Sequence, residues 1–459
     1  MQLKKQIARA VKHIAAIDTK TSLTPAQIDL ITQRVLTDVR SGTYDFSKAD
    51  LLVLSQNGKK RLVKRYLDQY STENVLCQCI KTILDKDFSV RYPNRNKIIR
   101  TLIGTLAAIK KMSDFTIIRF DFKDYFNSIS TDYFYKKYIL DSLSDREALG
   151  IIKKFCEDTE YAYAGLSTSN SIAEIIASSF DELVVHHFSA EGLIFYERYI
   201  DDGVIILNSH VQEPLVRDML NTIRDTVYCD ASIQSKRRCK TVFNNSKFQY
   251  LSKRSLASSA SSFDFLGYEF FISQDHADVT IQTGITMEKQ QKYRKRLDKL
   301  ISMYSDPTSM DYKNVELLRH RVAAFTSREV YMSVRYRQDV WKVKGFISNY
   351  GELRNILGTK SIHADTERFL KNMVEDEFRS AGFLPYFIKG SPKTKPGYCL
   401  YENMRKNKTI LLVDGIGYNF EALKKLCSKV GISTVDASGK KRTYAALVRD
   451  YLIKVNVGY

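Results

Sequence analysis

The chain has 459 residues, of which 44% are apolar and 27% are charged, a composition typical of globular proteins; the length predicts two or three domains. Extensive disorder and collagen-like or low-complexity structure are excluded, since there are only 20 Gly and 7 Pro. The formal net charge is +19, and residues 291–459 hold 32 basic and 17 acidic side chains, which indicates a polyanionic partner, with a merely soluble basic surface as the alternative.

Membrane insertion and a disulfide framework are not expected. No run of about 18 apolar residues occurs, so the sequence predicts no transmembrane helix and no membrane partner. The first 20 residues are basic without a long apolar stretch, which favours an amphipathic helix over a secretory signal. The seven Cys form no C-x-x-C pair and are odd in number, which suits a reducing cytoplasm.

Residues 1–112 are predicted to be helical. Thr24 is a suitable N-cap and Pro25 a suitable first residue for a helix that continues with apolar side chains at helical spacing. Two further helices are predicted, with loop or turn segments before each: helices 59–84 and 97–111, loops 41–45 and 92–96.

Strand signals appear in the middle of the chain. FTIIRF (115–120) is a short β-rich run, and the apolar runs 193–199 and 204–207 flank Ile200-Asp-Asp-Gly203, which is a strong hairpin signal. A second β pair is predicted at 263–271 and 279–282. Helices are predicted between these strands, at 132–156, 172–188 and 211–228.

The last third is predicted to be helical and basic. The segment YMSVRYRQDVW (331–341) is interpreted as a helix, and 410–413 as one short strand. The fold class is therefore α+β in three regions: a helical N-terminal region at 1–112, a β-rich region at 113–287, and an all-helical basic domain at 288–459.

Acidic residues at strand ends are the chemical centre of the sequence. Asp121 follows a predicted buried strand, and Asp201 and Asp202 lie at the tip of a predicted hairpin. If these strands are neighbours, Asp121 and Asp201 share one rim, where carboxylate oxygens hold two Mg²⁺ ions for phosphoryl transfer. The alternative is that Asp202-Gly203 is simply turn chemistry.

These segments together resemble the palm of reverse transcriptases over roughly residues 90–285. Asp121 with an aromatic five residues later is similar to the first catalytic motif of that family, and Tyr199-Ile-Asp-Asp202 is similar to its Y-x-D-D motif. Three further segments follow the family's order: the loop Gly165–Asn170 before a helix, Lys240-Thr241 after the hairpin helix, and Phe265-Leu266-Gly267 as a primer-grip hairpin.

The resemblance implies a role for each matching residue. Asp121 and Asp201 would be metal ligands with the Phe122 carbonyl as a third, Asp202 a weaker catalytic participant, and Lys240 a proton donor to pyrophosphate or a solvated charge. Phe126 would stack under the sugar and exclude a 2′-hydroxyl, with a core Phe as the alternative. The other nucleotide-binding positions are Tyr125, Gly165, Arg95 and Arg100, of which the arginines could equally be helix-surface charges.

The sequence departs from the reverse-transcriptase pattern at several positions, and these departures indicate which group of the family it resembles. Ala164 stands where the family usually has a template-positioning Gln before Gly165, and neither a thumb sequence, a V-T-G signature nor an endonuclease follows. The chain thus looks like the abortive-infection (Abi) group of prokaryotic reverse-transcriptase-like proteins, which implies fingers and palm followed by a HEPN-like or α-repeat C-terminal domain. HEPN ribonuclease chemistry is not expected, because no His follows an Arg at the required spacing.

This resemblance implies a bacterial cytoplasmic DNA polymerase of phage defence, untemplated and protein-primed, in a homo-oligomer. Its cofactor would be Mg²⁺, with Mn²⁺ as a substitute, and its partners dNTPs and a single-stranded DNA product. A templated RNA-directed enzyme with an RNA partner is one alternative, and a catalytically silent nucleic-acid-binding scaffold is another. Tyr44 is one priming candidate among 28 Tyr.

Overall fold

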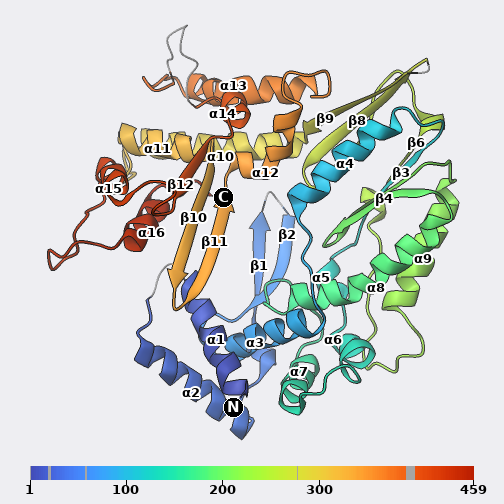
Figure 1. Ribbon diagram of the computed structural model, residues 1–459, viewed down its shortest axis with the longest axis horizontal. Helices are drawn as coiled ribbons and strands as arrows, with labels where there is room; N and C mark the ends of the chain where they lie inside the picture. Colours follow the sequence, from blue (N-terminus) through green and yellow to red (C-terminus); the bar gives the residue numbers. More distant parts are fainter. Residues whose placement is uncertain (1, 19–21, 57–58, 277, 389–397, 459) are drawn as a thin grey trace. The chain divides into compact units, whose positions relative to one another are not determined.

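The computed structural model describes residues 2–18, 22–56, 59–276, 278–388 and 398–458. By its internal contacts the chain divides into two compact units, residues 1–98 with 104–256 and residues 99–103 with 257–459. Both units mix helices with sheets whose strands are mostly antiparallel (Figure 1). The division at 256/257 lies before the boundary expected at 287, because the sheet of residues 261–285 packs with the C-terminal residues.

The first unit is built around a four-stranded antiparallel sheet in the order β4-β5-β3-β6. Its strands are β3 (Thr116–Asp121), β4 (Leu193–Tyr199), β5 (Asp202–Leu207) and β6 (Gln249–Ser252). Its helices are α1 (Gln2–Ile17), α2 (Pro25–Ser41), α3 (Thr72–Asp87), α4 (Arg95–Ile109), α5 (Tyr125–Ser128), α6 (Thr131–Phe134), α7 (Arg146–Asp158), α8 (Ser169–Ser189) and α9 (Glu213–Tyr228). Residues 99–103 in the middle of α4 are assigned to the second unit.

An aromatic cluster forms the core beside the sheet. Phe120 and Phe122 on and after β3 contact Phe180 of α8, with ring centroids 5.8 and 5.3 Å apart, and Phe243 stacks on Phe122 at 4.9 Å. Figure 1 shows α8 and α9 alongside the sheet. Because all six residues of β3 are buried, the strand that ends in Asp121 is anchored on both faces.

Several local signals produce the predicted elements. Thr24 caps α2 in a capping box with Gln27, Pro25 is its first residue, and Gly42 ends it in the left-handed conformation. The predicted helix 132–156 is instead interrupted: a short π-helix (Tyr135–Ile139) follows α6, and Asp145 caps a separate helix, α7. The predicted strands 115–120, 193–199, 204–207 and 279–282 and the helix 172–188 are confirmed within small shifts of their ends. The predicted strand 263–271 is instead divided by a turn at Leu266-Gly267 into two antiparallel strands, 261–265 and 268–275.

The expectation of an entirely helical region 1–112 is wrong. The strands β1 (Asp50–Gln56) and β2 (Lys59–Arg65) pair in antiparallel, so the predicted helix 59–84 begins only at α3. Facing residues of the two strands satisfy each other's backbone hydrogen bonds, and the loop at Ala164 adds a bond to Lys64. This pairing outweighs the helix propensity of the Lys- and Leu-rich segment.

The second unit contains strands as well as helices, and two of these strands, 328–335 and 338–344, lie in the region 288–459 that was expected to be helical. Its strands are β7 (Ser261–Phe265), β8 (Tyr268–Asp275), β9 (Asp278–Ile285), β10 (Arg328–Arg335), β11 (Gln338–Lys344) and β12 (Thr409–Leu412). Its helices are α10 (Met287–Ser305), α11 (Val315–Phe325), α12 (Phe346–Tyr350), α13 (Ala364–Ser380), α14 (Leu400–Arg405), α15 (Phe420–Lys429) and α16 (Tyr444–Lys454).

The largest difference concerns residues 331–341, which form a hairpin rather than a helix. β10 and β11 pair across Tyr336 and Arg337, which both adopt the left-handed conformation (φ 56° and 61°) that a two-residue turn of this type requires. The predicted strand at 410–413 is confirmed as β12 and pairs in parallel with β10. In the described part of the chain, no helix is both long and apolar enough to cross a membrane.

Candidate active site

The three acidic residues singled out in the sequence meet at one edge of the four-stranded sheet. Asp121 ends β3 and lies opposite Asp202, the first residue of β5, in the antiparallel register. Asp201 occupies the two-residue turn before β5, and its carbonyl accepts the Phe122 N–H at 2.9 Å. The neighbouring strands therefore bring residues 121 and 201, which are distant in sequence, to the same rim.

Gly203 belongs to the strand and not to the turn, which corrects the interpretation of Asp202-Gly203 as turn residues. Tyr199 pairs with Asp202, so the turn itself is Ile200-Asp201. A Cβ atom on Gly203 would lie 2.2 Å from Cζ of Phe120. The glycine is required because the Phe120 ring lies against its backbone, and this close approach holds β3 and β5 in register.

Basic and amide side chains surround the carboxylates. Lys247 Nζ lies 2.6 Å from Asp121 Oδ2, and the Asn244 amide donates to Asp121 Oδ1 at 3.2 Å. The buried Arg119 guanidinium lies 2.8 Å from Asp202. Lys247 and Asn244 belong to the segment after the hairpin helix, and nothing in the local sequence pattern distinguished them from other surface residues.

Asp202 is a perturbed acid at this rim. Burial, together with the negative charges of Asp121 and Asp201, raises the pKa of Asp202 to about 7 in spite of the nearby Arg119. Three carboxylates that share one rim repel each other unless a cation joins them. The negative charge at this rim therefore favours a positively charged ligand.

The donor chemistry at this rim suits Mg²⁺. Asp121 and Asp201 supply carboxylate oxygens, the ligands that Mg²⁺ prefers, although no group of three or more His, Cys, Asp or Glu side chains in the described ranges is arranged as a metal site. Lys247 holds Asp121 in this arrangement, so metal binding requires that lysine to move away. The side chain of Phe122 is buried, and only its backbone could contribute a ligand.

The two aromatic residues after Asp121 lie in different environments. Phe126 is the second residue of the short helix α5 and is half-buried. Tyr125 is 3% exposed, and its hydroxyl bonds to the hydroxyl of Tyr228 at 2.7 Å and to the carbonyl of Ala173 at 3.3 Å. Tyr125 is thus a core residue here, whereas the sequence placed it at the nucleotide.

The loop that begins at Gly165 packs against the β1–β2 hairpin. The φ of Gly165 is +102°, and a Cβ atom there would lie 2.5 Å from the carbonyl oxygen of Lys64. The Lys64 N–H donates to the carbonyl of Ala164 at 2.8 Å, and its ammonium lies 4.0 Å from the centre of the Tyr163 ring. Gly165 therefore permits a close backbone contact between this loop and β2.

The other predicted basic residues have distinct surroundings. The ammonium of Lys240 is exposed and lies 4.9 Å from the centre of the Tyr161 ring, so the lysine in contact with Asp121 is Lys247 instead. Arg95 is half-buried in the first turn of α4. Arg100 belongs to the second unit, where its guanidinium forms two 3.0 Å hydrogen bonds with the carboxylate of Glu352.

The predicted primer-grip residues form the turn of the β7–β8 hairpin. Phe265 is fully buried and pairs with Tyr268, while Leu266 and Gly267 adopt positive φ values of 52° and 80°. These residues belong to the second unit. The priming candidate Tyr44 is 7% exposed and packs edge-on against Phe46, so most of its surface is covered within the first unit.

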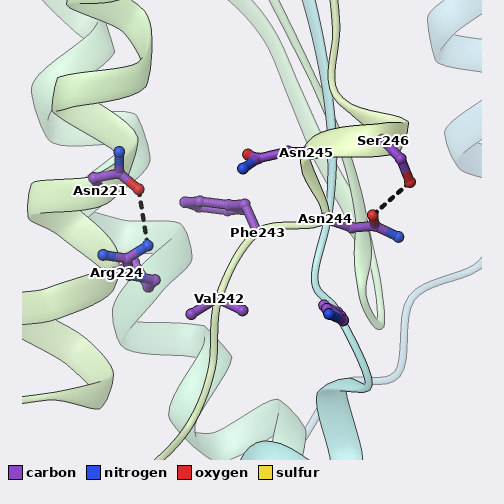
Figure 2. A pocket seen from close by; sticks show the side chains of 8 residues that line it. Asn221, Arg224, Val242, Phe243, Asn244, Asn245 and Ser246 are labelled. Atoms are coloured by element: carbon purple, nitrogen blue, oxygen red, sulfur yellow. Dashed lines mark hydrogen bonds between the residues drawn. The ribbon is translucent and has the colours of Figure 1, made fainter.

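A pocket of ≈ 660 Å³ lies beside Asn244, the residue that bonds to Asp121 (Figure 2). Asn221 and Arg224 line it from α9, Lys123 from the residues after β3, and residues 242–246 from the opposite side. Figure 2 shows Phe243 between α9 and Asn245. The lining includes no acidic side chain, so its chemistry suits a phosphate-bearing ligand, although Arg224 is already paired with Asp225 at 2.7 Å.

Comparison with known proteins identifies no family. No protein-family model and no curated protein matches the sequence. Among solved structures, telomerase from Candida albicans in complex with a TWJ fragment of telomeric RNA matches with a TM-score of 0.33 and 11% identity over 58% of this chain. The chain spans 51% of that telomerase. Telomerase from Candida tropicalis, also with a TWJ fragment, matches with the same score and identity over 79% of this chain and 67% of its own. Scores of this size do not establish a shared fold.

Proposed function

We propose that this chain is a Mg²⁺-dependent DNA polymerase of the reverse-transcriptase type, with fingers and palm in its first unit. We further propose that it acts without a template and from a protein primer in anti-phage abortive infection in the bacterial cytoplasm. The observation that carries the proposal is the pairing of β3 with β5, which brings Asp121, Asp201 and Asp202 to one edge of an antiparallel sheet. Two-metal phosphoryl transfer needs carboxylates in such an arrangement.

Each residue of the rim would have a separate role in the proposed reaction. Asp121 and Asp201 would hold Mg²⁺, which lowers the pKa of an attacking hydroxyl and neutralises charge on the transferring phosphoryl group. Asp202 remains tied to Arg119 and keeps the start of β5 in place. Lys247 would release Asp121 to a metal ion and would then offset negative charge on the departing pyrophosphate. The half-buried Phe126 would exclude a 2′-hydroxyl with its ring.

The environment of Ala164 supports untemplated synthesis over the templated alternative. Its side chain is 6% exposed and its carbonyl is bonded to the N–H of Lys64. The loop therefore presents no amide side chain where templated relatives carry Gln. A templated RNA-directed polymerase that uses an RNA partner is the second candidate, because it requires the same metal site.

Incubation of the purified full-length chain with labelled dNTPs and Mg²⁺, with and without added RNA template, tests the proposal. Asp201→Ala is the matched control, since it removes one proposed ligand and leaves the sheet intact. We expect incorporation without nucleic acid, and label that stays attached to protein until protease treatment. Incorporation only with RNA would favour the templated enzyme, and equal inactivity of both proteins would favour a silent nucleic-acid-binding scaffold. Mass spectrometry of the labelled protein would identify the priming residue.

A further inference from the structure

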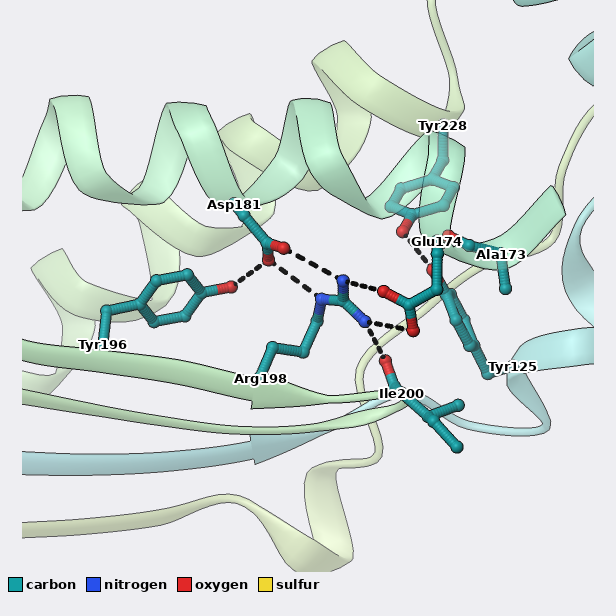
Figure 3. A network of polar contacts seen from close by, with 8 residues as sticks. All are labelled: Tyr125, Ala173, Glu174, Asp181, Tyr196, Arg198, Ile200 and Tyr228. Atoms are coloured by element: carbon teal, nitrogen blue, oxygen red, sulfur yellow. Dashed lines mark hydrogen bonds and ion pairs between the residues drawn. The ribbon is translucent and has the colours of Figure 1, made fainter. Parts of the chain in front are cut away.

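A buried arginine lies immediately below the turn that carries Asp201. Arg198 is in β4, three residues before Asp201, and its side chain is 4% exposed. Its guanidinium contacts Glu174 Oε2 at 2.8 Å and both carboxylate oxygens of Asp181 at 2.9 Å. It also donates to the carbonyl of Ile200 at 2.8 Å (Figure 3). Arg198 thus contacts the backbone of the active-site turn directly.

The surroundings of Arg198 hold it in one orientation. A planar guanidinium matches two carboxylates through paired hydrogen bonds, and Glu174 and Asp181 both project from α8. The Tyr196 hydroxyl donates to Asp181 at 2.5 Å and fixes the carboxylate further. Figure 3 shows the guanidinium between these two acids, with its remaining donor directed at Ile200. Arg198 therefore links the position of the turn to the long helix α8.

The turn needs such support because Ile200 is strained. Its φ is 61°, in the left-handed region, which disfavours β-branched residues. Two hydrogen bonds hold successive carbonyls of this turn: Arg198 donates to Ile200, and the Phe122 N–H donates to Asp201 at 2.9 Å. Together they determine the direction in which the side chain of Asp201 leaves the rim.

We propose that Arg198 is a positioning residue for Asp201. It holds the Ile200 carbonyl, keeps the turn in its strained conformation and so keeps the Asp201 carboxylate beside Asp121. The catalytic consequence of this role rests on the proposed function, but the geometric role does not. Tyr125 adds a second link to the same part of α8, because its hydroxyl bonds to the carbonyl of Ala173, next to Glu174.

Amide hydrogen exchange at Phe122 tests the geometric role without any metal or nucleotide. The Phe122 N–H bonds to Asp201, so its protection reports whether the turn is in place. In Arg198→Lys and Arg198→Met we expect exchange at Phe122 to rise by about tenfold or more, the effect of losing one charged hydrogen bond. Amides in the middle of β3, which pair with β5 and β6, should keep their protection.

Arg321→Met is the matched control for loss of a buried arginine. Arg321 is buried in the second unit and contacts Asp311 at 2.8 Å. We expect this variant to lose thermal stability without faster exchange at Phe122. If Arg198→Lys, which retains the charge, left exchange at Phe122 unchanged, or if Arg321→Met raised it equally, the positioning role would be refuted.

A second measurement connects the geometry with the proposed function. Arg198→Lys should raise the Mg²⁺ concentration for half-maximal nucleotide incorporation several-fold more than it changes the apparent KM for dNTP, because the defect lies at a metal ligand. Faster exchange at Phe122 in a protein whose wild type incorporates no nucleotide would support the positioning role and contradict the proposed function. If the wild type incorporates nucleotides but the Arg198 variants keep normal exchange at Phe122, the result would support the proposed function and contradict the positioning role.

Discussion

Replacement of Gly203 by Ala tests the packing that brings the acidic residues together. The added Cβ would lie 2.2, 2.6 and 2.8 Å from three atoms of the Phe120 ring, all well inside the usual carbon–carbon contact of about 3.5–4 Å, and the nearest is inside it by more than about 1 Å. The ring cannot move easily, because it is fully buried and contacts Phe122, Phe180 and Phe243 with centroids 5.9, 5.8 and 5.5 Å away. The methyl group must therefore displace β3 from β5.

We expect Gly203→Ala to destabilise the first unit by about 3 kcal/mol, the upper part of the range for overpacked cores. For a unit of this size the thermal midpoint should fall by about 6–10 °C. Nucleotide incorporation should fall as well, since Asp121 and Asp202 are paired across the same two strands. Differential scanning calorimetry and the incorporation assay measure the two effects.

Gly150→Ala and the second-site substitution Phe120→Leu serve as controls. Gly150 lies in α7, and a Cβ there would meet nothing within 4 Å, so this variant should gain about 0.5–1 kcal/mol. Phe120→Leu should cost stability alone but restore part of it in Gly203→Ala, with a coupling of at least about 1 kcal/mol. A Gly203→Ala protein as stable as the wild type, or the absence of this coupling, would contradict the packing argument.

Four further predictions concern the site and the stability of the chain. Asp201→Ala should abolish incorporation while the thermal midpoint stays level or rises, because loss of one carboxylate relieves repulsion; activity in the folded variant would disprove the metal assignment. Phe126→Ala should admit ribonucleotides, which a comparison of rNTP and dNTP incorporation measures, and an unchanged preference would return Phe126 to a core role. Lys247→Ala should lower the Mg²⁺ concentration for half-maximal activity by up to about fivefold, because the salt bridge to Asp121 no longer competes with the metal. Burial lowers the pKa of His320 from 6.5 to about 4, so the unfolded chain takes up its proton first and the free energy of unfolding should fall by about 2–3 kcal/mol as the pH drops from 6.5 to 4; His320→Gln should lack this loss in denaturant titrations.

The sequence alone was sufficient for the elements whose signals are local. The cap at Thr24, the helix α8 and the strands around Asp121 and Asp202 follow from side-chain spacing and turn residues, and the structure has them where they were expected. The proximity of Asp121 and Asp201 followed from one assumption, that their strands are neighbours. The register confirms that assumption.

Only the tertiary structure decided which strands form from ambiguous segments. β2 and the β10–β11 hairpin contain residues that suit either a helix or a strand, and the turn Tyr336-Arg337 carries no Gly or Asn to announce it. Such segments become strands because a partner strand satisfies their backbone groups. A pattern of neighbouring residues does not contain that information.

Some residues around the catalytic rim could likewise be recognised from the sequence, and others only from the tertiary structure. Asp121, Asp201 and Asp202 could be recognised from their own segments, whereas Lys247 reaches Asp121 across 126 positions and Arg198 meets Glu174 across 24. The burial of Tyr125 and the need for glycine at 203 likewise depend on side chains from other elements. Local sequence determined the strand ends and the acidic residues they carry, because backbone propensity and turn chemistry act between near neighbours. The folded chain decided which cations hold those acids and which atoms fill the space beside them, because these contacts exist only after distant segments have packed together.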